Sequence, residues 1–262
     1  MNIGITESDK KELQLAKKLL ENPGIAAKLT SIIGTPIENG FEKLPENWKA
    51  KIGELTQKSL LKAADAAIFT MDENYYEEPS NKWHKLGVAA SGGIGGLFGL
   101  AALAIELPIS TTIMLRSIAD IARSQGELIT EFETKLACLE VFALGGESKS
   151  DDAADSGYFF IRAGLAASVS EALAARTTGE KATPALIKFI INITQRFGIQ
   201  ISEKAAAQAI PIIGAAGGAL INTIFIDHFQ DMAKGHFIIR KLERIYGQDL
   251  IKETYNLLDI KV

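Results

Sequence analysis

The chain of 262 residues has a single cysteine, three histidines and no block of basic residues. The lone Cys138 cannot form a disulfide within the chain, which fits a reducing compartment. Because Leu136, Ala137 and Leu139 beside it are apolar, we expect a buried structural thiol rather than a nucleophile. The formal net charge of −4, without a basic block, argues against a general nucleic-acid or anionic-membrane surface.

The motifs of common enzyme classes are also missing from the sequence. It contains no Gly-x-Ser-x-Gly elbow, P-loop, Rossmann glycine motif or zinc-finger spacing. The glycines of residues 91–96 resemble a phosphate loop, but no predicted strand precedes them. The N-terminus has no positive start followed by an apolar run, so we expect no signal peptide. We therefore predict a cytoplasmic protein, peripheral to the inner membrane, with no cofactor and no metal.

The pattern of apolar residues favours helices throughout. No segment alternates β-branched and polar residues over the length of a strand, whereas helical spacing recurs, so we predict an all-α fold. We expect one bundle of many helices, with two glycine-rich apolar helices at its centre. The expected domains are an N-terminal helical extension, residues 1–44, and a helical domain, residues 45–262. The predicted helices cover approximately residues 7–21, 46–70, 109–124, 131–144, 157–176, 183–197, 225–246 and 249–258.

Several helix ends have recognisable signals. Pro108 and Pro184 are expected in the first turns of their helices, where the missing N–H costs little. Thr130 followed by Glu133 has the spacing of a capping box for the helix that begins at residue 131. Gly145 is expected to end that helix.

Two uncharged, glycine-rich stretches, residues 86–105 and 205–226, are each long enough to cross a bilayer as a helix. Glycine costs about 0.8–1 kcal/mol in a helix relative to alanine, so close helix packing must offset it. We favour central helices of a bundle over conditional membrane contact, and a stable span is the least favoured. The residues expected at a ligand-binding or membrane-contact surface are Gly92, Gly95, Gly96, Phe98, Gly99, Gly214 and Gly218.

Five polar residues are candidates for burial among apolar neighbours. Since a buried acid needs a partner, Arg116, Arg123 and Arg162 are candidate partners, and a structural ion-pair network is favoured over a proton relay or catalytic carboxylate pair. The candidates are Glu106, Arg116, Glu140, Asp227 and His228.

The segment 227–236 contains two aspartates and two histidines, which could supply metal ligands. It lacks a recognised metal motif, so a solvated helix end is favoured over a metal site. Basic side chains on the C-terminal helices are expected to be mostly solvated, with a phospholipid-headgroup patch as the alternative. They are Lys181, Lys188, Arg196, Lys204, Lys234, Arg240, Lys241 and Arg244.

Three blocks of sequence together resemble the EcsC protein family of bacteria, over about residues 45–258. They lie at Glu106 to Arg123 (ELP…LRSIADIAR), Leu136 to Gly145 (LACLEVFALG) and Ile210 to Gly247 (IPIIGA…N…DHFQDMA…GH…LERIYG). The family is named for a protein encoded beside an ABC transporter, and its activity is not established. The resemblance implies a bacterial cytoplasmic or membrane-associated protein and supplies no catalytic residue.

We carry three functional hypotheses from the sequence. The first is a non-enzymatic protein that binds membrane lipid or a membrane protein, for instance as an accessory to a transporter, and does not bind nucleic acid. The second is a metal-dependent or carboxylate-based enzyme, in which Glu106, Glu140, Asp227 and His228 would converge. The third is a scaffold for helix-mediated assembly.

Overall fold

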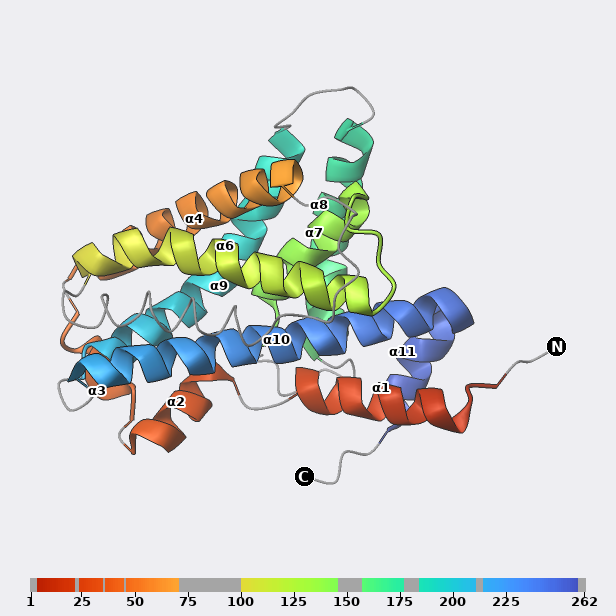
Figure 1. Cartoon of the computed structure of the whole chain (residues 1–262), viewed down its shortest axis with the longest axis horizontal. Coiled ribbons are helices and arrows are strands. Elements are labelled where there is room, and N and C mark those ends of the chain that lie inside the picture. The colour runs from red at the N-terminus through yellow and green to blue at the C-terminus, as the bar shows by residue number, and fades with distance from the viewer. Residues whose placement is uncertain are drawn as a thin grey trace.

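The computed structural model describes residues 4–21, 24–34, 36–44, 46–70, 100–145, 157–176, 184–210 and 214–258. These residues form ten α-helices and one 3-10 turn, with no strand among them, so the all-α prediction is confirmed (Figure 1). The elements are α1 (Glu7–Leu20), α2 (Ile25–Ile33), α3 (Glu38–Phe41), α4 (Trp48–Thr70), α6 (Leu100–Ser124), α7 (Phe132–Glu140), η1 (Val141–Ala143), α8 (Gly157–Arg176), α9 (Pro184–Gln208), α10 (Gly214–Tyr246) and α11 (Gln248–Leu257).

Local sequence accounts for several helix ends. The Thr6 side chain accepts a hydrogen bond from the backbone N–H of Asp9, at 3.2 Å, and so caps α1. Gly34, with φ of 69°, ends α2 in the left-handed region that glycine adopts without strain. Pro184 opens α9, and Gly145 follows η1 with φ of 76°, as predicted for both residues.

Two helices are longer than their sequence patterns indicated. Helix α6 runs without a break from residue 100 to 124, so Pro108 lies inside it rather than in its first turn. The proline removes one backbone hydrogen bond, but α6 packs along both α4 and α10, which holds the helix together. In the same way, α9 continues to Gln208, beyond the predicted end at residue 197.

Helix α7 begins one residue later than predicted, at Phe132. The residue that precedes the first turn of α7 is Glu131, and its side chain makes no capping hydrogen bond. Helix α7 also ends at Glu140, and the chain tightens into η1 before Gly145. Buried packing of Leu136, Leu139 and Phe142 against the core stabilises this segment.

Helix α10 organises the bundle. It has 33 residues, and α1 and α6 pack along its length while α11 folds back onto its C-terminal part (Figure 1). Helix α4 lies against α6 and α9, and α8 packs on α9. Residues 7–20, which belong to the expected N-terminal helical extension, contact α10.

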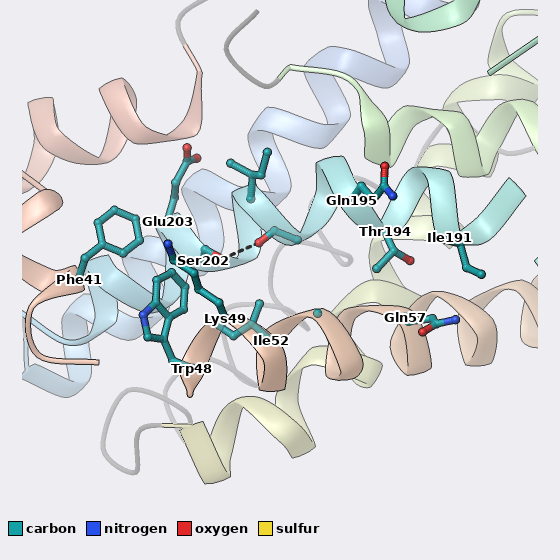
Figure 2. A pocket seen from close by; sticks show the side chains of 13 residues that line it. Phe41, Trp48, Lys49, Ile52, Gln57, Ile191, Thr194, Gln195, Ser202 and Glu203 are labelled. Carbon is teal, nitrogen blue, oxygen red and sulfur yellow. Dashed lines mark hydrogen bonds between the residues drawn. The ribbon is translucent and has the colours of Figure 1, made fainter. Parts of the chain in front are cut away.

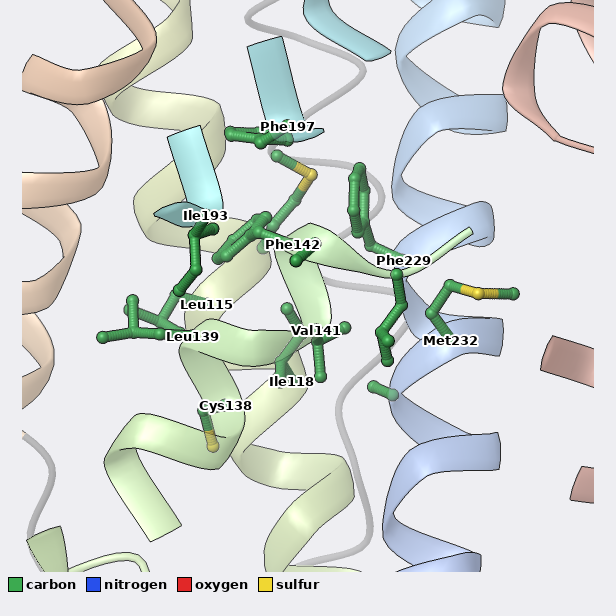
Figure 3. Packing of buried hydrophobic residues seen from close by; sticks show 14 of the residues in the cluster. Leu115, Ile118, Cys138, Leu139, Val141, Phe142, Ile193, Phe197, Phe229 and Met232 are labelled. Carbon is green, nitrogen blue, oxygen red and sulfur yellow. The ribbon is translucent and has the colours of Figure 1, made fainter. Parts of the chain in front are cut away.

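Aromatic rings fill the centre of the bundle, where η1, α9 and α10 meet (Figure 3). Phe142 lies 4.8 Å from Phe197 and 5.3 Å from Phe229, measured between ring centroids. Cys138 is buried on α7, and burial raises the pKa of its thiol, so the thiol is protonated at neutral pH (Figure 3). A structural role for this cysteine is therefore supported.

The glycine-rich stretches are described only in part. Gly92, Gly95, Gly96, Phe98 and Gly99 lie outside the described residues. Gly214 begins α10 and Gly218 is buried within it. The following residues of the second stretch, such as Ile221 and Phe225, are in the core. Over the described ranges, no helix has both the length and the hydropathy that a membrane span requires.

Candidate functional site

An open groove with a volume of about 940 Å³ lies between α4 and α9 (Figure 2). The two helices run antiparallel here, because Trp48 of α4 lies near Ser202 of α9, whereas Gln57 lies near Thr194 (Figure 2). Residues 191–203 span about 18 Å of α9 at a rise of 1.5 Å per residue. The groove is therefore elongated and follows the two helix axes.

One face of α9 places large apolar side chains in solvent. Ile187, Ile191 and Ile199 are 40%, 40% and 59% exposed, and the last two line the groove. Ile187 and Ile191 are one turn apart, and Ile199 is rotated by about 80° from Ile191, so the two isoleucines that line the groove lie on one broad side of the helix. Single exposed apolar residues are ordinary, but Ile191 and Ile199 together give the groove a continuous apolar wall on α9.

The end of the groove at the start of α4 combines aromatic and polar groups. The rings of Phe41 and Trp48 stack with centroids 5.4 Å apart, and the Lys49 ammonium lies 5.8 Å from the centre of the indole (Figure 2). Ser202 and Glu203 face them from α9. Because Trp48 and Lys49 combine apolar surface with hydrogen-bond donors, this end suits the junction between an apolar chain and a polar headgroup.

Two glycines face the groove from opposite walls, Gly53 on α4 and Gly198 on α9. A Cβ atom built on either glycine would meet no other atom within 4 Å, and neither residue has a positive φ. Neither close helix packing nor backbone conformation therefore requires glycine here, although each costs about 1 kcal/mol relative to alanine in a helix. Their effect on the structure is to widen the groove.

Glu106 is buried, as expected, but its partner is Lys204. The Lys204 ammonium donates to both Glu106 oxygens, at 2.9 and 3.0 Å, and Asn222 donates to one of them at 3.2 Å. Lys204 is fully buried and also lies 4.9 Å from the centre of the Phe225 ring. A lysine expected on a solvated face is thus part of an ion pair in the core, which sequence spacing alone did not reveal.

The other polar candidates have different surroundings. Glu140 and His228 are buried, whereas Asp227 is half-buried. Arg116 is exposed, so its expected burial is wrong, because it lies on the side of α6 that faces away from the core. Burial lowers the pKa of His228 to about 3, so this imidazole is neutral.

The four residues of the enzyme hypothesis do not converge. Glu106 binds Asn222, whereas Glu140 lies beside His236, and these two positions are about 21 Å apart along α10. No group of three or more histidine, cysteine, aspartate or glutamate residues in the described ranges could hold a metal ion.

Most of the basic side chains proposed for a headgroup patch have acidic partners. Arg240 and Arg244 both bind Glu127, and Arg240 also reaches Glu133. Lys188 pairs with Glu171, and Lys241 with Glu12. This arrangement lowers the positive potential that such a patch would present to anionic lipid.

Residues 7–242 match the EcsC protein family. The chain belongs to the EcsC protein family. The match begins at residue 7, so it includes most of the segment that we assigned to an N-terminal extension. No curated protein and no solved structure matches the chain significantly. Membership of the EcsC family therefore agrees with the resemblance found in the sequence, and it assigns no ligand or reaction.

Sequence reasoning did not find the groove of this EcsC-family protein. A usable signal was present, because residues 186–201 are apolar around more than one side of the predicted helix. Such a helix has more apolar surface than one core contact can cover. What the sequence does not show is that α4 leaves part of that surface open.

Proposed function

We propose that this EcsC-family protein binds the acyl chain of a membrane lipid in the groove between α4 and α9. We further propose that this binding holds the protein at the inner membrane as a peripheral protein. The observation that carries the proposal is the pair of exposed isoleucines, Ile191 and Ile199, that line an open apolar groove.

The form of the groove supports an acyl chain as its occupant. It is long, about 18 Å along α9, and its middle is lined by the side chains of Ile52 and Ile199 and by the two glycines. Its volume of about 940 Å³ is at the upper end of the range for small-molecule pockets. The end with Trp48 and Lys49 would lie at the lipid headgroup, where an ammonium can bind phosphate or carboxylate.

The two groove glycines allow a test that leaves the fold intact. Gly53→Leu and Gly198→Leu each place a large side chain in the groove, where a Cβ meets no neighbour within 4 Å. The control is Gly164→Leu on α8, a mid-helix glycine that also has open space around its Cβ and does not line the groove. All three changes replace glycine by a residue with a higher helix propensity, so none should unfold the protein.

The measurement is flotation of the protein with neutral and anionic liposomes at low and high salt, together with titration of a fluorescent fatty acid. We expect binding that survives high salt, because the contact is apolar. The two groove variants should weaken fatty-acid binding at least tenfold, and Gly164→Leu should leave it unchanged. Equal binding by all four proteins would refute the proposal, as would a wild-type protein that binds neither probe.

A further inference from the structure

A second pocket, with a volume of about 370 Å³, lies among α7, α8, α10 and α11, and it is separate from the groove. Glu140, at the end of α7, lines it with a side chain that is only 10% exposed. This carboxylate accepts no hydrogen bond from the described residues, and the nearest basic nitrogen is Nε2 of His236, at 3.9 Å from Oε2. A buried carboxylate without a donor is costly, so the pocket has an unsatisfied site.

A chain of hydrogen bonds orients His236 behind this carboxylate. Arg162 binds both oxygens of Glu243, at 2.7 and 3.0 Å, and donates to the hydroxyl of Tyr158 at 3.3 Å. Since arginine can only donate, the Tyr158 hydroxyl accepts this bond and its own proton is available for Nδ1 of His236, 3.0 Å away. Nδ1 is then the acceptor.

The tautomer of His236 follows from that arrangement. Burial lowers the pKa of His236 well below its usual value, so the ring is neutral, and its one proton is on Nε2. Nε2 has no hydrogen-bond partner among the described residues and faces Glu140. The network thus points the Nε2–H group of His236 toward the Glu140 carboxylate from the core, and the carboxylate faces the pocket on its other side.

The charges around Glu140 do not balance. Arg162 pairs with Glu243, and Arg240 pairs with Glu127 and Glu133, so each guanidinium near Glu140 already has an acid of its own. From α11 the pocket adds one charge of each sign, Asp249 and Lys252. When Glu140 is ionised, the pocket therefore carries one negative charge without a matching cation.

We propose that this pocket binds a small organic ammonium ion, whose N–H groups donate to the Glu140 carboxylate and whose apolar part packs against Phe159, Val169 and Leu173. The three apolar residues form the wall contributed by α8. An apolar wall beside a single uncompensated carboxylate favours an organic cation over a hydrated inorganic one.

Binding is coupled to a proton. Burial raises the pKa of Glu140 to about 7, so below this pH the free pocket holds a neutral carboxylic acid. The arriving ammonium keeps its own proton, and the Glu140 proton leaves to the solvent, so one proton is released for each ligand bound. Affinity should therefore fall about tenfold per pH unit below 7 and level off above it.

The test is calorimetric titration of the full chain with the 2-phenylethylammonium ion at pH 6, 7 and 8, in two buffers of different ionisation enthalpy. We expect binding that is strongest at pH 8 and a release that approaches one proton per ligand at pH 6. Glu140→Gln should weaken binding at least tenfold at pH 8 and abolish its pH dependence. Glu131→Gln removes the same charge from an exposed residue outside the pocket and should change neither the affinity at pH 8 nor its pH dependence.

A second pair of variants keeps the test valid if Glu140→Gln unfolds, which thermal denaturation would reveal. Ala166→Phe fills the pocket from α8, whereas Ala167→Phe adds the same ring at the neighbouring exposed position outside it. Loss of binding in the first variant alone supports the proposal. No binding of the probe at pH 8, binding without proton release, or equal binding by Glu140→Gln would each overturn it.

Discussion

Removal of the Lys204 ammonium should destabilise the fold strongly. In Lys204→Met the ammonium is lost, and the Glu106 carboxylate, whose side chain is 3% exposed, keeps only the hydrogen bond from Asn222. Breaking a buried ion pair by removing one partner costs about 3–5 kcal/mol, because it leaves an uncompensated charge in the core. At about 2–4 °C per kcal/mol for a domain of this size, the melting temperature should fall by about 10 °C.

The double variant Glu106→Gln/Lys204→Met separates lost attraction from the cost of the orphaned charge. A neutral amide next to methionine leaves no buried charge, so most of the lost stability should return. A surface pair supplies the control, because Lys58 and Glu54 are about two-thirds exposed and Lys58→Met should cost less than about 0.5 kcal/mol. The measurement is urea denaturation at neutral pH. A cost below about 1 kcal/mol for Lys204→Met, or a double variant no more stable than the single one, would refute the reasoning.

Three further changes test other parts of the structure. Burial raises the pKa of Glu140 from the ordinary value of 4.5 to about 7, so between these pH values the native state binds more protons than the unfolded chain. The free energy of unfolding should therefore fall as pH rises from 4.5 to 7, by about 3 kcal/mol in total. Glu140→Gln should remove this loss, and urea denaturation of both proteins at pH 5 and pH 8 measures it; an unchanged difference between the two pH values would contradict the assignment. Gly40→Ala should lower the melting temperature, because its Cβ would overlap the carbonyl oxygen of Ala206 where α3 meets α9. Gly53→Ala should instead raise the free energy of unfolding by up to about 1 kcal/mol, since its Cβ has open space, and a drop in its melting temperature would show that the groove wall is packed.

Helical periodicity predicted much of the local structure correctly. The helix at residues 157–176 has the predicted ends, and α1 begins at the predicted position, where Thr6 caps it. Prediction was poorer where packing opposes the local signal. Pro108 was expected in the first turn of a helix, yet α6 begins eight residues earlier and continues through the proline because it packs along α4 and α10.

The candidate sites depend on contacts between helices far apart in the sequence. The sequence by itself determined that Glu106 and Glu140 sit among apolar residues, and both are buried. It could not choose their neighbours, since Lys204 lies 98 residues from Glu106, and no local rule relates residues at such a distance.

The groove also depends on contacts between helices that are far apart in the sequence. The sequence alone determined that residues 184–208 have more apolar surface than a single buried stripe requires. Only the tertiary structure decided that part of this surface stays open beside Gly53 and Gly198. The physical reason is that local sequence sets the direction of side chains around one helix axis, whereas packing of the whole bundle sets the distance between axes.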